Sequence, residues 1–300
     1  MSAAVRLGTF TPGSPEWVTT RSTSLGASDI AAVLRLSPWQ SAFSLWHEKR
    51  GVLTPEPDTE VLRRGRLLEP VVAAWFAEQH PEYKVRRTGT WANRARPWQI
   101  ATPDRLLHAL TGRAVLEIKT ATDPGEWGEP GTGEIPIHYR CQVLWQLDTL
   151  GLTRGHVAVL TSGLEFREYV VEWNIDEVEL LRAAGREFLD TIDRDERPDI
   201  DTHGATYRAV RLLHPDIADV EVEIAPGLAE HYRAAVAAHK QAEQTKQQAT
   251  ARVMDALGTG RRAVVDGESI AIRVPGRAGG PPSLRPSPIR MTPQKVSAAA

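Results

Sequence analysis

Two charged residues interrupt an apolar segment at residues 114–121, which reads AVLEIKTA. The apolar residues around them predict a buried strand, and side chains two positions apart on a strand project from the same face. Glu117 and Lys119 therefore share one face, whereas Leu116 and Ile118 share the other. Because an unpaired charge is costly to bury, the pair needs a role or a partner. Taken alone, it could be an ordinary ion pair on an exposed sheet face.

A second acidic residue precedes this strand at the distance expected within a hairpin. Residues 98–110 and 113–121 read as two strands joined by a short turn, which favours antiparallel pairing. Asp104 follows a proline that restricts the local backbone conformation, so its carboxylate should point into the candidate site in a defined direction. Asp104, Glu117 and Lys119 would then meet on one side of a small sheet. Two carboxylates suit Mg²⁺ or Mn²⁺, and the lysine could position or deprotonate a water.

A third acidic residue is expected from a helix. Residues 59–80 carry apolar side chains at the i, i+3, i+4, i+7 and i+8 spacing of an amphipathic helix. Glu69 flanks this apolar stripe, which is where a side chain at the edge of the core would point into a cleft. Pro70 either kinks the helix or begins a new one.

Several short motifs occur in the order found in a known superfamily. They read GRLLEP at 65–70, PD at 103–104, EIK at 117–119 and YRCQ at 139–142. Together they resemble the PD-(D/E)xK nuclease superfamily. The upstream segment LGASDIAAVLRLSPW is similar to the YqaJ-like viral recombinase and lambda exonuclease branch, and the resemblance covers residues 17–195.

This resemblance implies roles for the matching residues. Metal ligands would be Glu69, Asp104, Glu117 and the backbone carbonyl of Ile118. Lys119 would orient the attacking water, and Gln142 with Tyr139 would support the active centre or contact DNA.

The resemblance also implies a pocket for the 5′-phosphate of DNA, built from an arginine and a serine seven residues later. Arg21 and Ser28 have this spacing, and such groups at a helix start suit an anion. Ser28 could instead be only a helix cap. Arg66 and Arg105 belong to an arginine cluster around the proposed site, which could follow DNA phosphates or be a solvated face.

The family implies a Mg²⁺-dependent exonuclease without an iron–sulfur cluster. Its members form rings, often trimers, that encircle duplex DNA and digest one strand from the 5′ end. They work with a single-strand annealing protein in phage recombination. We therefore expect a phage- or prophage-encoded protein in the bacterial cytoplasm.

Two other functions remain open. A non-catalytic DNA-binding scaffold could keep the fold, although the complete set of acids with Lys119 argues against it. A structure- or sequence-specific endonuclease could use the same residues. A Cas4-like enzyme is excluded because iron–sulfur binding needs a cysteine cluster and Cys141 is the only cysteine.

The composition agrees with a globular protein that has a sizeable core. The 300 residues are 41% hydrophobic and 25% charged, with a net charge of −2, so any positive surface for DNA must be local. A single cysteine favours a reducing compartment, and we find neither a signal-like segment nor an apolar run of about 18 residues.

The fold class expected is α/β (α+β), with a restriction-endonuclease-like core: a central mixed sheet flanked by helices and a helical C-terminal appendage. The expected divisions are a flexible segment at 1–16, the nuclease domain at 17–195, a helical and hairpin appendage at 196–274 and a disordered tail at 275–300.

Ser28 and Asp29 are candidate N-caps of a short helix, and Asp176 is a candidate N-cap of a later one. The nine tryptophans include Trp39, Trp46 and Trp75, which we expect to pack in the core rather than stack on bases.

Overall fold

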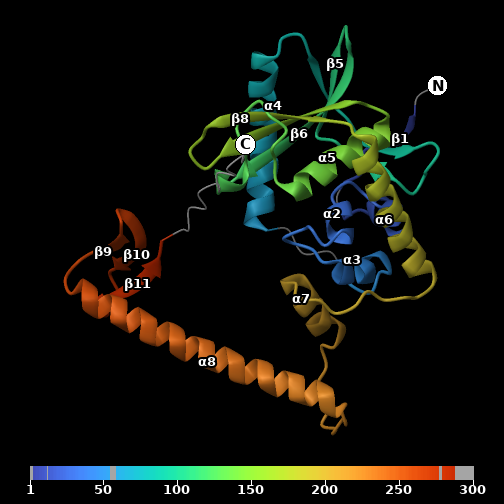
Figure 1. Cartoon of the computed structure of the whole chain (residues 1–300). Helices are drawn as coiled ribbons and strands as arrows, with labels where there is room; N and C mark the ends of the chain where they lie inside the picture. Colours follow the sequence, from blue (N-terminus) through green and yellow to red (C-terminus); the bar gives the residue numbers. More distant parts are fainter. Residues whose placement is uncertain (1–2, 12, 55–58, 277–278, 288–300) are drawn as a thin grey trace, which may run out of the picture. The chain divides into compact units, whose positions relative to one another are not determined.

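A computed structural model describes residues 3–11, 13–54, 59–276 and 279–287. The chain divides into two compact units, the first ending at Ile217 and the second beginning at Ala218. The first unit holds a five-stranded and a three-stranded sheet, and the second unit holds a separate three-stranded sheet (Figure 1).

The five-stranded sheet is the centre of the first unit, with strand order β2-β5-β6-β7-β8. Neighbours are antiparallel except β6 and β7, which run parallel, so the predicted mixed sheet is confirmed. The predicted hairpin is confirmed as well, since Ala109 pairs with Gly112 at the turn between β5 and β6. The strands are β2 (Lys84–Arg87), β5 (Arg105–Ala109), β6 (Gly112–Ala121), β7 (Arg154–Thr161) and β8 (Phe166–Glu172).

Helices cover both faces of this sheet (Figure 1). Helix α4 (Glu60–Gln79) runs unbroken with Pro70 inside it, and it packs in one apolar cluster with Leu116 and Ile118 of β6. Helix α5 (Ile137–Leu150) packs in another cluster with Val115 of β6. Because Glu117 and Lys119 alternate with Leu116 and Ile118, they lie on the α5 face.

Polar contacts fix α5 at its C-terminal end. The Asp148 carboxylate on α5 accepts hydrogen bonds from Arg96 (3.0 Å), Gln99 (2.8 Å) and Arg182 (2.9 Å to Nε). Arg182 belongs to α6 (Ile175–Asp193), which Asn174, rather than the predicted Asp176, caps through its side chain. The buried carboxylate therefore joins two segments, the loop between β3 and β4 and helix α6, to the helix that faces Glu117.

A second sheet, ordered β1-β3-β4, lies in the N-terminal part of the first unit. It consists of β1 (Ala4–Gly8), β3 (Thr90–Asn93) and β4 (Ile100–Ala101). The prediction of a flexible segment at 1–16 is wrong over β1, which pairs antiparallel with β3 and buries Ala4. Its partner lies more than eighty residues away, so local composition carries no sign of it.

Short helices surround the N-terminal motif and the end of the first unit. They are α1 (Pro15–Ser22), α2 (Ile30–Val33), α3 (Ala42–Lys49) and α7 (Gly204–Leu213), with a 3₁₀ turn at Pro124–Glu126. Ala209 of α7 packs with Phe43 of α3 in a small apolar cluster. Helix α7 thus belongs to the first unit, and the nuclease domain boundary at residue 195 stays a prediction.

The second unit contains α8 (Pro226–Leu257) and a sheet ordered β11-β10-β9. The turn between β9 (Arg262–Val265) and β10 (Glu268–Val274) has positive φ at Asp266 and Gly267, as a two-residue hairpin turn requires. The predicted disordered tail is wrong over β11 (Ser283–Pro286), which pairs with β10; residues 277–278 and 288–300 lie outside the described residues. Within the described ranges, no helix combines the length and apolarity needed to cross a membrane.

Candidate active site

Glu117 and Lys119 form one hydrogen-bonded group with Gln142 of α5. The Lys119 Nζ donates to Glu117 Oε1 (2.7 Å) and to Gln142 Oε1 (3.0 Å), and Gln142 Nε2 donates to Glu117 Oε1 (2.5 Å). The predicted shared face is therefore confirmed. Glu117 is only 3% exposed, so the alternative of an ion pair on an exposed sheet face is wrong.

Gln146 also holds Glu117 and was not among the predicted site residues. Its Nε2 donates to Glu117 Oε2 (2.8 Å), and its side chain is fully buried. Within the described part of the chain, Gln146 Oε1 has no hydrogen-bond partner. Residues four apart on a helix share a face, so its spacing from Gln142 was the available sequence signal. Both oxygens of Glu117 are thereby held in a defined orientation.

Asp104 directly precedes β5, and its Oδ2 accepts a hydrogen bond from the backbone N–H of Ile118 (2.7 Å). Burial raises the pKa of Asp104 well above its usual value, and the nearby Glu117 and Glu69 carboxylates raise it further. Lys119 and the Ile118 N–H lower the pKa of Asp104, but by less than burial and the two carboxylates raise it. The site thus brings Asp104 and Glu117 close enough to repel each other.

Lys119 stays protonated in this environment. Burial lowers its pKa, but Glu117 and Asp104 more than offset that effect, so the pKa lies above its ordinary value. The ammonium lies 4.7 Å from the centre of the Tyr139 ring, and burial raises the pKa of Tyr139. A charged lysine can donate hydrogen bonds to a water or a phosphate oxygen, whereas it is a poor base.

Glu69 forms an ion pair with Arg105. Arg105 is buried, and its Nη1 donates to Glu69 Oε1 and to the backbone carbonyl of Asp104 (2.6 Å). Among the residues that the structure describes, no three His, Cys, Asp or Glu side chains lie together in a way that could hold a metal ion. The role of Glu69 as a metal ligand stays a prediction.

The remaining acids fit a hard divalent cation chemically. Asp104 and Glu117 are neighbouring carboxylates in a buried site, and their mutual repulsion is what bound Mg²⁺ or Mn²⁺ would relieve. These two side chains and the Ile118 carbonyl would hold the ion through oxygen, the donor that both metals prefer.

The raised pKa of Asp104 predicts an effect on stability. In EDTA near neutral pH, Asp104→Asn should increase the free energy of unfolding, because it removes a buried carboxylate. Each kcal/mol of that increase should raise Tm by about 2–4 °C. An acid with a raised folded-state pKa destabilises the protein increasingly as pH rises from its unfolded value of 3.8 to the folded value. The gain should therefore vanish below that unfolded value. Calorimetry against exposed Asp216→Asn would test this, and an unchanged or lower Tm at neutral pH would contradict it.

Arg21 and Ser28 approach the same buried carboxylate. Asp29 pairs with Arg21 and with Lys49 Nζ (2.7 Å), and Ser28 Oγ lies 3.4 Å from Asp29 Oδ1. Burial opposes ionisation, yet Arg21 and Lys49 hold the pKa of Asp29 far below its ordinary value. Asp29 occupies the N-cap position of α2, as predicted, but its carboxylate makes no capping hydrogen bond. It accepts instead from Lys49 and from the Gly26 N–H (3.0 Å). The phosphate pocket stays a prediction.

The other predicted residues surround this centre. Tyr139 is half-buried and stacks on Trp127 at 5.5 Å between ring centres. Arg66 is exposed on α4, one turn before Glu69. Cys141 is buried, and burial raises its pKa to about 11, so it is a neutral thiol rather than a nucleophile.

Comparison with known proteins places these residues in a family. Residues 16–153 match the family model of the YqaJ-like viral recombinase domain. The chain is 28% identical over 207 residues to the uncharacterized protein YqaJ of Bacillus subtilis (strain 168). That match covers 67% of this chain and 63% of the relative, so the chain spans less than two thirds of the relative's length.

The fold resembles that of a solved structure. The crystal structure of LHK-Exo in complex with dAMP matches with a TM-score of 0.50 at 18% identity, over 61% of this chain and 94% of that chain. The structure of LHK-Exo, an alkaline exonuclease from Laribacter hongkongensis, matches with a TM-score of 0.47 at 17% identity, with the same shares covered. The fold is the predicted PD-(D/E)xK fold, and residues 16–153 are similar to the YqaJ-like viral recombinase domain family.

Proposed function

We propose that this protein is a divalent-metal-dependent exonuclease that degrades one strand of linear duplex DNA, with 5′-to-3′ polarity. The observation that carries the proposal is the buried group of Glu117, Lys119 and Gln142 beside Asp104. It combines oxygen ligands for a hard cation with a fixed positive charge for a phosphate. The similarity of residues 16–153 to the YqaJ-like viral recombinase domain supports a role in phage-type recombination.

The side chains divide the chemistry between them. Asp104 and Glu117 would hold Mg²⁺ or Mn²⁺, which when bound activates water and stabilises charge on the phosphodiester oxygens. Lys119, held between Glu117 and Gln142, would orient the attacking water and donate a hydrogen bond to a non-bridging phosphate oxygen. Gln142 and Gln146 keep the Glu117 carboxylate from rotating. Glu69 would join the metal site only on leaving Arg105.

A phosphate site near Arg21 and Ser28 would explain a preference for a 5′ end. Arg21 is partly exposed and Ser28 is exposed, so both can reach a bound phosphate. Arg66 and Arg105 would add positive charge beside the site. We further propose a ring of identical subunits, with a trimer favoured, and an annealing protein as the partner that receives the exposed single strand.

The decisive test compares end-labelled linear duplex with a closed circle of the same sequence, each with and without Mg²⁺. We expect Mg²⁺-dependent release of nucleotides from the linear DNA, faster with a 5′-phosphate, and no cutting of the circle. Cutting of the circle would show an endonuclease instead. Binding without cleavage in either Mg²⁺ or Mn²⁺ would show a DNA-binding scaffold.

A further inference from the structure

Trp39 is the most exposed of the nine tryptophans, at 58% of its surface. The prediction of a core position is correct for Trp46, which is 3% exposed, but wrong for Trp39. The prediction is also wrong for Trp75, which is 38% exposed and whose ring stacks on Phe166. An exposed tryptophan ring forgoes the stabilisation that its burial would provide. We therefore looked for a function of Trp39 in the residues around it.

Trp39 lies one aromatic ring away from the candidate active site. Its ring centre is 5.7 Å from that of Tyr139, which in turn lies 4.7 Å from the Lys119 Nζ. The neighbouring His138 ring also contacts Trp39, with ring centres 4.8 Å apart and planes nearly perpendicular. An exposed aromatic surface therefore adjoins the place where Lys119 would meet a phosphodiester.

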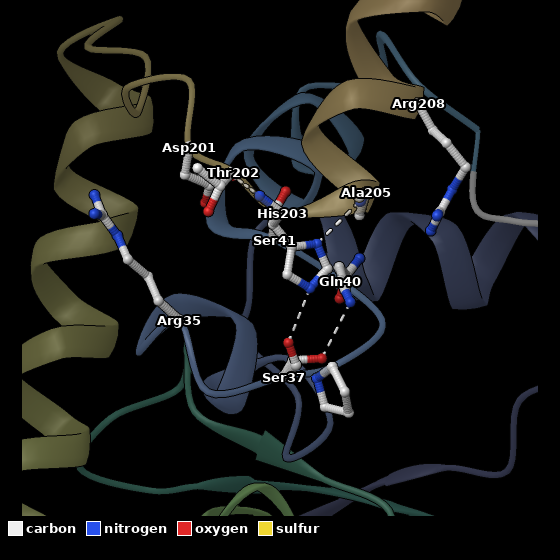
Figure 2. Close-up of a pocket in the computed structure, with 11 residues that line it drawn as sticks. Arg35, Ser37, Gln40, Ser41, Asp201, Thr202, His203, Ala205 and Arg208 are labelled. Atoms are coloured by element: carbon white, nitrogen blue, oxygen red, sulfur yellow. Dashed lines mark hydrogen bonds between the residues drawn. The ribbon is translucent and has the colours of Figure 1, made fainter. Parts of the chain in front are cut away.

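The backbone that carries Trp39 is held by Ser37. The Ser37 Oγ accepts hydrogen bonds from the N–H groups of Trp39 (3.2 Å) and Gln40 (3.1 Å). The Ser37 carbonyl accepts from His203 Nε2 (3.0 Å), and His203 Nδ1 accepts from the Ala205 N–H at the start of α7 (3.0 Å). Figure 2 shows the contacts of Ser37 with Gln40 and His203, and that of His203 with Ala205. A ring on a braced segment loses little conformational freedom on binding a ligand.

The charge around this segment favours a nucleic acid over an apolar protein surface. A cavity of about 660 Å³ borders the same segment, with Arg35 and Arg208 on its two sides and Asp201 on the side of Arg35 (Figure 2). Arg35 and Arg208 both carry guanidinium groups, which are suited to binding phosphate oxygens. Nucleic acid combines such phosphates with bases that stack on aromatic rings.

We infer that Trp39 binds an unpaired nucleobase of the DNA substrate, by stacking, next to the phosphodiester that faces Lys119. The inference rests on the proposed function in that DNA is the substrate. It adds a site for a base, contributed by the segment between α2 and α3 and braced from α7. Trp39 is a positioning residue: it would hold the strand end so that its phosphate meets the metal ligands.

The first test measures binding without metal, so that cleavage does not interfere. Fluorescence anisotropy in EDTA would give Kd values of the full chain for a fluorescein-labelled duplex with a single-stranded 5′ extension. Trp39→Ala should raise Kd about 10-fold or more, because stacking is lost, while Trp39→Phe should keep most of the affinity. Trp75→Ala is the matched control and should bind as the wild type does. Equal Kd values for Trp39→Ala and the wild type would overturn the inference.

The second test locates the contact directly. A 5-iododeoxyuridine in the single-stranded extension should photocross-link to Trp39, within the tryptic peptide of residues 36–49. Fragment ions distinguish Trp39 from the buried Trp46 in that peptide. A cross-link confined to another part of the chain would overturn the inference, as would a Trp39→Ala variant with altered oligomeric mass and unaltered DNA binding.

The two proposals fail in different ways. If the wild type cross-links at Trp39 but digests no DNA in Mg²⁺ or Mn²⁺, the base site stands and the exonuclease proposal fails. If the wild type digests linear DNA but Trp39→Ala binds and digests it equally well, the exonuclease stands and the base site fails.

Discussion

Lys119→Met is expected to slow the release of nucleotides from linear duplex DNA by about 10²-fold or more. Methionine retains much of the length and apolar volume of lysine but removes the ammonium that Glu117 and Gln142 hold at 2.7 and 3.0 Å. Without it, neither the attacking water nor a phosphate oxygen has this charged donor. The pKa of Asp104 should rise further, because Lys119 lowers it in the native protein.

The assay is the initial rate of nucleotide release at saturating Mg²⁺, with circular dichroism to show that the variant is folded. Lys84→Met is the matched control, because Lys84 is exposed on β2 of the same sheet. It should digest DNA at the wild-type rate. A Lys119→Met rate within a few-fold of the wild type would remove Lys119 from the mechanism.

Lys49→Met is expected to lower the free energy of unfolding by about 3–5 kcal/mol, the usual cost of breaking a buried ion pair on one side. The Lys49 Nζ donates to Asp29 Oδ2 (2.7 Å) and to the backbone carbonyls of Ser24 (2.7 Å) and Arg21 (2.8 Å). Both Lys49 and Asp29 are buried. The variant leaves the Asp29 carboxylate with fewer donors and two carbonyls without their ammonium.

The pH dependence of this loss has a definite sign. The pKa of Asp29 is held far below its ordinary value, so its ion pairs stabilise the fold above the unfolded pKa of 3.8. That stability is lost as pH falls toward the folded value. The difference in unfolding free energy between wild type and Lys49→Met should therefore shrink below about pH 4.

Chemical denaturation between pH 3 and pH 7 would measure both effects. Adding Asp29→Asn to Lys49→Met should recover part of the lost stability near neutral pH, because the unpaired charge is then removed. Exposed Lys240→Met, on α8, serves as the control and should stay near the wild-type value. Equal stabilities of Lys49→Met and wild type would show that the pair does not stabilise the fold.

Local geometry explains what was predictable from the sequence. The alternation of a strand determines that Glu117 and Lys119 share a face, and the short turn determines that β5 pairs with β6. The apolar spacing of residues 59–80 likewise specifies α4. These features depend only on neighbouring residues. The ordered motifs added the core fold and the resemblance to a family.

Packing between segments that are distant in the sequence decided the contacts that could not be predicted. Only the folded chain brings Arg105 to Glu69, Gln146 to Glu117 and Lys49 to Asp29. The same is true of the strand β1, whose partner β3 lies far along the sequence, and of Trp39, which lies at the surface beside Tyr139. Periodicity identifies which face a side chain occupies, but the element that covers that face is selected by close packing and by pairing of buried charges. The sequence by itself therefore determined the strand that carries Glu117 and Lys119, whereas the tertiary structure decided which side chains hold them.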